Sequence, residues 1–308
     1  MHMPVQGQFS SSSGAGPVQG QFRTGSRFQE KGMADFLKTG KKYGLTGAVL
    51  KNTAYITMLI DHFFAVVFLN YMQAHTVEGR WDPQLERIYR TGRAVGRVSF
   101  ILFTFLIVEG FFYTRSRVWF LVRLFLFALL SEIPFDLALS GTLFDESGQN
   151  VYWTLFLGVL VLTLWDYLSC YRNVFAAAGR WAALFAGCAA AFLYSTDYRF
   201  MGVLLIFAMY QTRERDGGVQ FMAAGLVMLF GTWGANLIRY AEKISAGLIT
   251  ADYLFRFSLR EMYGLFAFLL IFLYNEEKGR QLPKPFYYGF YPVHLLVLYG
   301  IARTIGVM

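Results

Sequence analysis

Apolar stretches long enough to cross a lipid bilayer recur along this 308-residue chain. A helix needs about 20 apolar residues to span the hydrocarbon core of a membrane. Hydrophobic residues make up 56% of the sequence and charged residues only 16%, which is unlike a soluble domain. We predict nine spans, with approximate bounds of about 45–72, 95–113, 118–138, 151–169, 180–195, 198–211, 219–238, 257–274 and 289–306.

These spans are expected to be helices, because in lipid every backbone polar group needs a partner within its own segment. The long apolar runs also lack the alternation of a lipid-facing β-barrel. The predicted fold class is therefore all-α, a polytopic membrane bundle of about eight to ten helices that forms one domain over residues 33–308. The count stays open because 198–211 is short and because 245–259 is suited to either a half-helix or a tenth crossing.

Residues 1–32 have a different composition from the rest of the chain. They are rich in Gly, Ser and Gln, and they contain the hexapeptide PVQGQF twice, at 4–9 and 17–22. This composition cannot build a packed core and is typical of a disordered tail. Residues 33–47 are basic and amphipathic, and we expect them to lie on the inner membrane surface.

The net charge of +8 does not indicate a nucleic-acid-binding protein, because the positive charges lie at the ends of apolar segments and form no single stripe. The short loops at 114–117, 170–180, 212–218 and 275–288 carry nine basic residues, whereas 140–150 carries none. The positive-inside rule therefore favours a multi-pass protein with a cytoplasmic amino terminus. With only Cys170 and Cys188, the sequence shows neither a disulfide framework nor zinc-ligand spacing, and we expect no metal.

Many charged and titratable residues nevertheless fall within the predicted spans. Such groups are costly in lipid, so they either pair across helices or line an aqueous or ligand-binding cavity. For individual residues both alternatives stay open. The set comprises Lys51, Asp61, His62, Arg97, Glu109, Arg123, Glu132, Asp136, Asp166, Asn236, Arg239, Arg256, Glu261 and His294.

His62 is the candidate general base, since histidine titrates near neutral pH and can accept and return a proton. A satisfied core histidine is the alternative. Asp61 points about 100° away from His62 on a helix. It is therefore expected to pair with an arginine of another helix rather than with that imidazole. His294, two residues after Pro292, is the second candidate base, because the proline is expected to unwind the helix there and expose a cavity.

The spacing of Lys51 and His62 places both residues on one helix face. Eleven residues correspond to about 16 Å along a helix and to three turns plus about 20°. One helix can therefore present a cation near its start and a base deeper in the membrane.

Five blocks of the chain, LKNTAYITMLIDH, GRVSFILFTFLIVEGFFYTRSRVWFLVRLFLFALLSEIPFDLA, NVYWTLFLG, GVLLIFAMY and FYPVHLL, resemble the TraX family in order and content. The resemblance covers about residues 45–300. The family is named for a conjugation-linked protein that acetylates the amino terminus of pilin, and it is similar to a wider group of membrane acyltransferases. One branch of that group has an arginine, ten residues and a catalytic histidine, which Lys51 and His62 match with lysine in place of arginine.

The resemblance implies an integral-membrane acyltransferase of the bacterial cytoplasmic membrane that takes acetyl-CoA as acyl donor. The acceptor is expected to be an amine or hydroxyl of a pilin, a sugar, a lipid headgroup or a small molecule, and membrane lipids are expected partners. A homodimer is left open. The expected site has three parts: His62, Asp61 and Glu109 for catalysis; Lys51, Arg97 and Arg123 for the donor; and Glu132, Trp153, Tyr291 and His294 for the acceptor.

Two other classes of function remain open. A secondary transporter also needs embedded charges and an interrupted helix, although we see no internal inverted repeat in the sequence. A non-catalytic scaffold of an envelope or conjugation complex would need the embedded charges only as structural pairs.

Overall fold

The computed structural model describes residues 44–76 and 80–308. The predicted tail and most of the predicted amphipathic segment lie outside these residues. Residues 45–308 form one compact unit, and the described part of the chain is helical, with isolated β-bridges but no strand. The prediction of an all-α helical bundle is confirmed.

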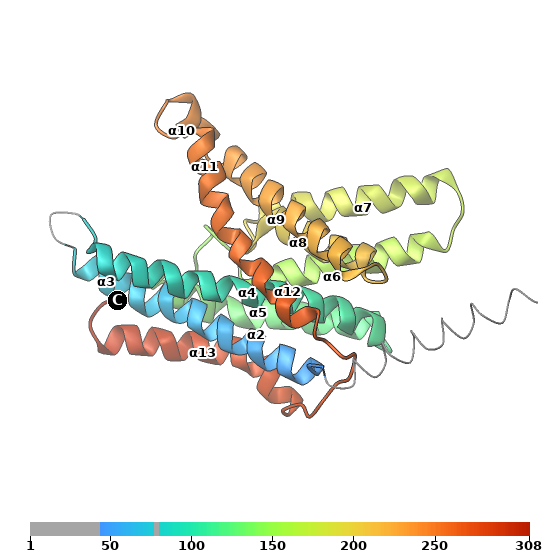
Figure 1. The fold of residues 1–308 in the computed structure, drawn as a ribbon, viewed down its shortest axis with the longest axis horizontal. Coiled ribbons are helices and arrows are strands. Elements are labelled where there is room, and N and C mark those ends of the chain that lie inside the picture. Colours follow the sequence, from blue (N-terminus) through green and yellow to red (C-terminus); the bar gives the residue numbers. More distant parts are fainter. Residues whose placement is uncertain (1–43, 77–79) are drawn as a thin grey trace, which may run out of the picture. The chain divides into compact units, whose positions relative to one another are not determined.

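The first half of this unit contains long helices and one π-helix (Figure 1). The elements are α2 (Gly47–His62), the π-helix η1 (Phe63–Phe68), α3 (Leu69–Ala74), α4 (Pro83–Tyr113), α5 (Arg117–Ser140), α6 (Val151–Ser169) and α7 (Val174–Leu193). The second half is more interrupted. It contains α8 (Arg199–Thr212), α9 (Gly217–Arg239), α10 (Ala241–Ser245), α11 (Ala251–Ser258), the 3-10 helix η2 (Leu259–Phe266), α12 (Ala267–Ile271) and α13 (Lys284–Thr304).

Six helical segments of the described chain are long and apolar enough to cross a membrane, so the protein is a multi-pass membrane protein. They are Gly47–Ala74, Pro83–Tyr113, Arg117–Ser140, Val151–Ser169, Val174–Leu193 and Gly217–Arg239. The other three predicted spans correspond to α8, which has 14 residues, to the interrupted segment 251–271, and to α13. Residues 245–259 hold the eight-residue α11 and make no crossing of their own.

Short polar residues fix where several of these helices begin. Asp82 caps α4 by accepting hydrogen bonds from the backbone of Gln84 (2.7 Å) and Leu85 (3.0 Å), and Pro83 occupies the first helical position. Such caps satisfy backbone N–H groups that have no partner within the helix. Asn150 starts α6 in the same way, and Asp216 starts α9.

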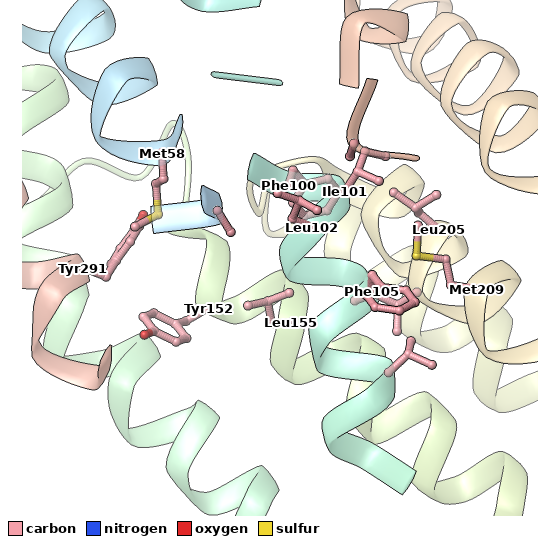
Figure 2. Packing of buried hydrophobic residues seen from close by; sticks show 14 of the residues in the cluster. Met58, Phe100, Ile101, Leu102, Phe105, Tyr152, Leu155, Leu205, Met209 and Tyr291 are labelled. Carbon is pink, nitrogen blue, oxygen red and sulfur yellow. The ribbon is translucent and has the colours of Figure 1, made fainter. Parts of the chain in front are cut away.

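Helices α2 and α4 lie side by side, and two glycines of α4 set their separation (Figure 1). The Phe64 ring occupies the position that a side chain at Gly92 would need, and the Asp61 carboxylate does the same at Gly96. The buried core continues from this interface through α4 toward α8, with Phe100, Phe105 and their neighbours (Figure 2). The close approach packs Asp61, near the end of α2, against α4, and His62 is the next residue of α2.

Two backbone features lie next to the candidate histidines. The chain changes from α-helix to π-helix directly after His62, and short π-helical segments are frequent at functional sites. Helix α13 continues through Pro292 without a break, so the expected unwinding there was wrong. The packing of α13 against α5 and η1 holds it helical despite the missing N–H group.

The α2–α4 contact can be tested with a Gly96→Ala variant. The new methyl group would overlap the Asp61 carboxylate, and overpacking of this kind costs about 1–3 kcal/mol. We expect this variant to have a lower melting temperature in detergent than the wild type, as measured by fluorescence-detected size exclusion. Gly300→Ala is the matched control, because no atom lies within 4 Å of the added group and alanine favours a helix. Equal melting temperatures for the two variants would contradict the close packing.

Candidate functional site

His62 and His294 form a part-buried pair, although 232 residues separate them in sequence. The His62 Nδ1 atom lies 2.6 Å from His294 Nε2, and the two rings stack with centroids 4.9 Å apart and an interplanar angle of 13°. His62 is the last residue of α2, and His294 lies in the middle of α13. The sequence offered these residues as separate candidate bases, and the structure brings them together.

The hydrogen bonds around this pair assign its tautomers. His294 Nδ1 lies 2.7 Å from the Phe290 carbonyl oxygen. A carbonyl only accepts, so His294 Nδ1 carries the proton and donates, and in a neutral ring its Nε2 must then be an acceptor. His62 therefore donates from Nδ1 to His294 Nε2. The remaining nitrogen of His62, Nε2, is left with a free lone pair and can act as a base.

Asp61 pairs with Arg93 of α4, as expected from the angle between Asp61 and His62. Arg93 Nη1 lies 2.7 Å from Asp61 Oδ2 and 3.1 Å from the Asp61 carbonyl oxygen. The sequence analysis missed Arg93 as a site residue, although its position four residues before Arg97 puts both on one face of α4. Asp61 thus holds the end of α2 in place rather than contacting the imidazole.

A largely apolar cavity of about 360 Å³ lies between α2, α4, α5, α6 and α13. We call it the apolar cavity. The residues on its wall that bear on ligand binding are Lys51, Tyr55, Met58, Arg123, Gln281, Tyr287 and Tyr291. Figure 2 shows Met58 of α2 lying close to Tyr291 of α13. The Tyr291 ring is in turn 5.8 Å from the His62 ring and 5.6 Å from the His294 ring, so this one wall residue links the cavity to the histidine pair, which does not itself line the cavity.

The two cations on this wall have no carboxylate partner among the described residues. Lys51 Nζ lies 3.4 Å from Gln281 Oε1 and 4.5 Å from the centroid of the Tyr287 ring. Arg123 lies over the Phe120 ring, and its Nε is buried without a hydrogen-bond partner in the described structure. A buried N–H group normally has a hydrogen-bond partner, so the Nε group of this part-buried arginine is available to an acceptor. The apolar cavity can therefore bind an anionic group with Lys51 and Arg123.

Arg97 belongs to a different part of the molecule. Its Nε lies 3.0 Å from Glu261 Oε2. Both residues line a second cavity of about 320 Å³ between α4, α9, η2 and the loops that precede α6 and α8. We call this the polar cavity. Arg97 therefore does not share a cavity with Lys51 and Arg123, the two other residues expected to bind the donor.

The family model described as TraX protein matches residues 46–302, which is most of the chain. The chain belongs to the TraX family. It is also 35% identical over 123 residues to the probable fimbrial assembly protein FimC, serogroup H1, of Dichelobacter nodosus, a match that covers 37% of this chain and 44% of that protein. The chain thus aligns with less than half of this curated relative. No solved structure matches it.

Two further polar residues of this TraX-family chain lie in structural contacts. Glu109 forms a two-point ion pair with Arg213, the residue after α8, with distances of 2.6 and 3.3 Å. This expected catalytic residue therefore contacts an arginine and neither histidine in the described structure. Glu132 accepts hydrogen bonds from Trp153 Nε1 at 2.8 Å and from the Asn150 amide. The expected acceptor residues Glu132 and Trp153 therefore contact each other, and they link α5 to α6.

The roles of Arg97 and Arg123 can be separated by mutation. Arg97→Gln leaves the Glu261 carboxylate unpaired, at a cost of about 3 kcal/mol, and should reduce the yield of monodisperse protein. Adding Glu261→Gln should restore that yield. Arg123→Gln breaks no ion pair in the described structure and should leave the yield unchanged. Size-exclusion profiles of the four proteins test this, and normal yield for Arg97→Gln alone would contradict it.

Asp197 gives the polar cavity a pH-dependent group outside the membrane-spanning segments. Burial raises its pKa to about 6, although Arg97 and Arg93 act in the opposite direction. The folded protein therefore binds this proton more tightly than the unfolded chain does. The free energy of unfolding should rise as pH falls from about 7 toward 4, because the buried carboxyl loses an unfavourable charge.

Thermal unfolding from pH 7.5 to pH 5 checks this prediction. The stability of the wild type should increase relative to Asp197→Asn as the pH falls, since the amide carries no charge at any pH. Parallel stability curves for the two proteins would show that Asp197 does not titrate in this range.

Proposed function

We propose that this protein is a membrane-embedded acyltransferase that uses an acyl-coenzyme A, with acetyl-CoA as the expected donor. The observation that carries this proposal is the His62–His294 pair, which has a free lone pair on His62 Nε2 and contacts Tyr291 on the wall of the apolar cavity. A base beside a ligand-sized cavity is what transfer of an acyl group to an amine or hydroxyl requires.

The apolar cavity suits the donor by its charge and by its lining. Lys51 and Arg123 would hold coenzyme phosphates, since charge-assisted hydrogen bonds to phosphate are strong and neither cation has a carboxylate partner in the described structure. Tyr55, Met58 and Tyr291 offer an apolar path toward the histidine pair for the acyl arm. Helix α2 is unbroken from Gly47 to His62, so the separation of about 16 Å between Lys51 and His62 holds.

His62 would act as the general base. Its Nε2 removes the proton from the acceptor amine or hydroxyl as that group forms its bond to the acyl carbon. The carbon–sulfur bond of the thioester then breaks, and the proton returned by His62 goes to the thiolate. His294 keeps His62 in the productive tautomer by accepting the Nδ1 hydrogen bond, and Phe290 fixes His294 in the same way.

The acceptor is proposed from the matched relative, and the orientation of the protein in the membrane is proposed from the basic loops. The match to a probable fimbrial assembly protein favours a pilus subunit as acceptor, and a sugar hydroxyl or lipid amine fits the same chemistry. Arg117, which pairs with Asp166, and Arg213, which pairs with Glu109, belong to the basic loops 114–117 and 212–218. By the positive-inside rule we place these loops in the bacterial cytoplasm, together with the end of the apolar cavity that Lys51 and Thr114 line. The donor would enter there. The proposed enzyme acts within lipid, and a homodimer is compatible with it.

The test is binding and thioester cleavage by the purified protein with labelled acetyl-CoA. His62→Ala should lower the rate of acetyl transfer to water or an added acceptor by about 10²–10⁴-fold, because a general base contributes that much. Coenzyme A binding should stay within about twofold, since binding rests on Lys51 and Arg123. Lys51→Ala should show the reverse, with weaker binding of coenzyme A and a cleavage rate at saturating donor that stays well above that of His62→Ala.

The matched control is His75→Ala. His75 stacks on Tyr71 at the end of α3, is exposed, and lies outside both cavities. It should behave like wild type. Cleavage unchanged in His62→Ala would contradict the proposal, and a transporter or scaffold would cleave no thioester at all.

His294 is a positioning residue in this mechanism, and a conservative variant tests that role. His294→Gln keeps an oxygen that can accept from His62 Nδ1, whereas His294→Ala does not. We expect the glutamine variant to retain several-fold more cleavage activity than the alanine variant in a pH series with the same donor. Equal activities, or a loss of folded protein in both, would show that His294 acts only through packing.

A further inference from the structure

The polar cavity carries more positive charge than its own carboxylates balance. Four arginines line it, namely Arg93 and Arg97 of α4, Arg199 at the start of α8 and Arg239 at the end of α9. Arg93 pairs with Asp61, and Arg97 pairs with Glu261. No described carboxylate pairs with Arg199 or Arg239.

Arg199 and Arg239 contact only aromatic rings in the described structure. Arg199 lies 5.7 Å from the centroid of Phe192, and Arg239 lies 5.5 Å from that of Tyr240. Both arginines line the same cavity, and Arg239 is exposed whereas Arg199 is part-buried. Two like charges that face one cavity are stabilised by an anion bound between them.

The turn that places Arg199 on this wall is strained. Ser195, Tyr198 and Arg199 have φ angles of 51°, 61° and 47°, in the left-handed region that costs non-glycine residues energy. Neighbouring backbone holds the turn, since Gln149 N donates to Ser195 O at 3.1 Å and Asp197 N donates to Gln149 O at 2.9 Å. Such over-determined strain is concentrated at binding and active sites.

The polar cavity is linked to the histidine pair through an ion pair at the end of α2. Arg93 lines the cavity and bonds to Asp61, the residue before His62. Tyr291 borders the apolar cavity, and its ring contacts both histidines. The histidine pair is therefore linked through Asp61 to a cavity rich in arginine and through Tyr291 to a cavity suited to the donor.

We propose that the polar cavity is an anion-binding site in which Arg199 and Arg239 hold the acceptor by a phosphate or carboxylate group. The assignment of the ligand as acceptor rests on the proposed function, whereas the anion site itself does not. Arginine suits this role because its planar fork binds either group by two parallel hydrogen bonds. Such an acceptor has two separate groups: a phosphate or carboxylate that binds in the polar cavity, and an amine or hydroxyl that reaches His62.

Binding of two probes to the full chain in phosphatidylcholine nanodiscs tests this site. Inorganic phosphate probes the polar cavity, and labelled coenzyme A probes the apolar cavity. Arg199→Gln and Arg239→Gln should each weaken phosphate binding at least tenfold and leave coenzyme A binding within twofold. Arg123→Gln should give the reverse pattern. Arg303→Gln is the control, because it removes an exposed arginine that lies outside both cavities.

Asp197→Asn sharpens the test, because it removes a negative charge from the wall while both arginines stay in place. Phosphate should then bind more tightly than to wild type at pH 7.5. Acetate in place of phosphate distinguishes the two anionic groups. Nanodiscs that include phosphatidylglycerol distinguish their source, since a lipid headgroup that occupies the site raises the apparent Kd for free phosphate and a soluble acceptor does not.

The failures of the two proposals are distinguishable. No binding of phosphate or acetate by wild type, or binding that persists in both Arg199→Gln and Arg239→Gln, overturns the anion site. Displacement of coenzyme A by phosphate at the same concentrations also overturns it, because the probes would then share one cavity. Loss of coenzyme A binding in the wild type with phosphate binding intact removes the acyltransferase proposal and leaves the anion site standing.

Discussion

A charge within a membrane-spanning bundle has to find a partner, and this constraint organises the described structure. Asp61 pairs with Arg93, Glu261 with Arg97, Glu109 with Arg213 and Asp166 with Arg117. Each pair joins two different helical elements or a helix and a neighbouring turn, so electrostatics and packing fix the same interfaces. The Asp61–Arg93 pair matters most, because it holds the end of α2 and with it the catalytic candidate His62.

Some charged residues of the described structure have no oppositely charged partner, and four of them are cations that line the two cavities. Lys51 and Arg123 face the apolar cavity, and Arg199 and Arg239 face the polar cavity, without a carboxylate partner among the described residues. A cation that lines a cavity and has no carboxylate partner is available to a ligand that supplies the missing charge. The place on a cavity wall is needed for this argument, because Arg180 of α7 also has no carboxylate partner in the described structure and lines neither cavity.

The sequence predicted the parts of this structure that depend on local pattern. Long apolar runs gave the helices, and the angle between Asp61 and His62 correctly indicated an arginine partner for the aspartate. The unbroken α2 also keeps Lys51 and His62 on one face, as the spacing predicts. What the pattern did not contain was tertiary information. Nothing near residue 62 indicates that a histidine 232 residues away completes its hydrogen bond.

A choice among the arginines needs the same tertiary information. Arg97 and Arg123 are equivalent by sequence, since both are arginines within predicted spans. Only the fold shows that Glu261 neutralises Arg97 and that Arg123 is left facing a cavity. Pro292 shows the converse error, because a local helix-breaking signal was overridden by the packing of α13.

The most direct test of the central claim is an electron cryo-microscopy map of the protein with coenzyme A bound. The account predicts density for the pantetheine arm in the apolar cavity, with its phosphates at Lys51 and Arg123 and its thiol end near His62 and Tyr291. Coenzyme density in the polar cavity, or between helices away from α2, would contradict the roles assigned to both cavities.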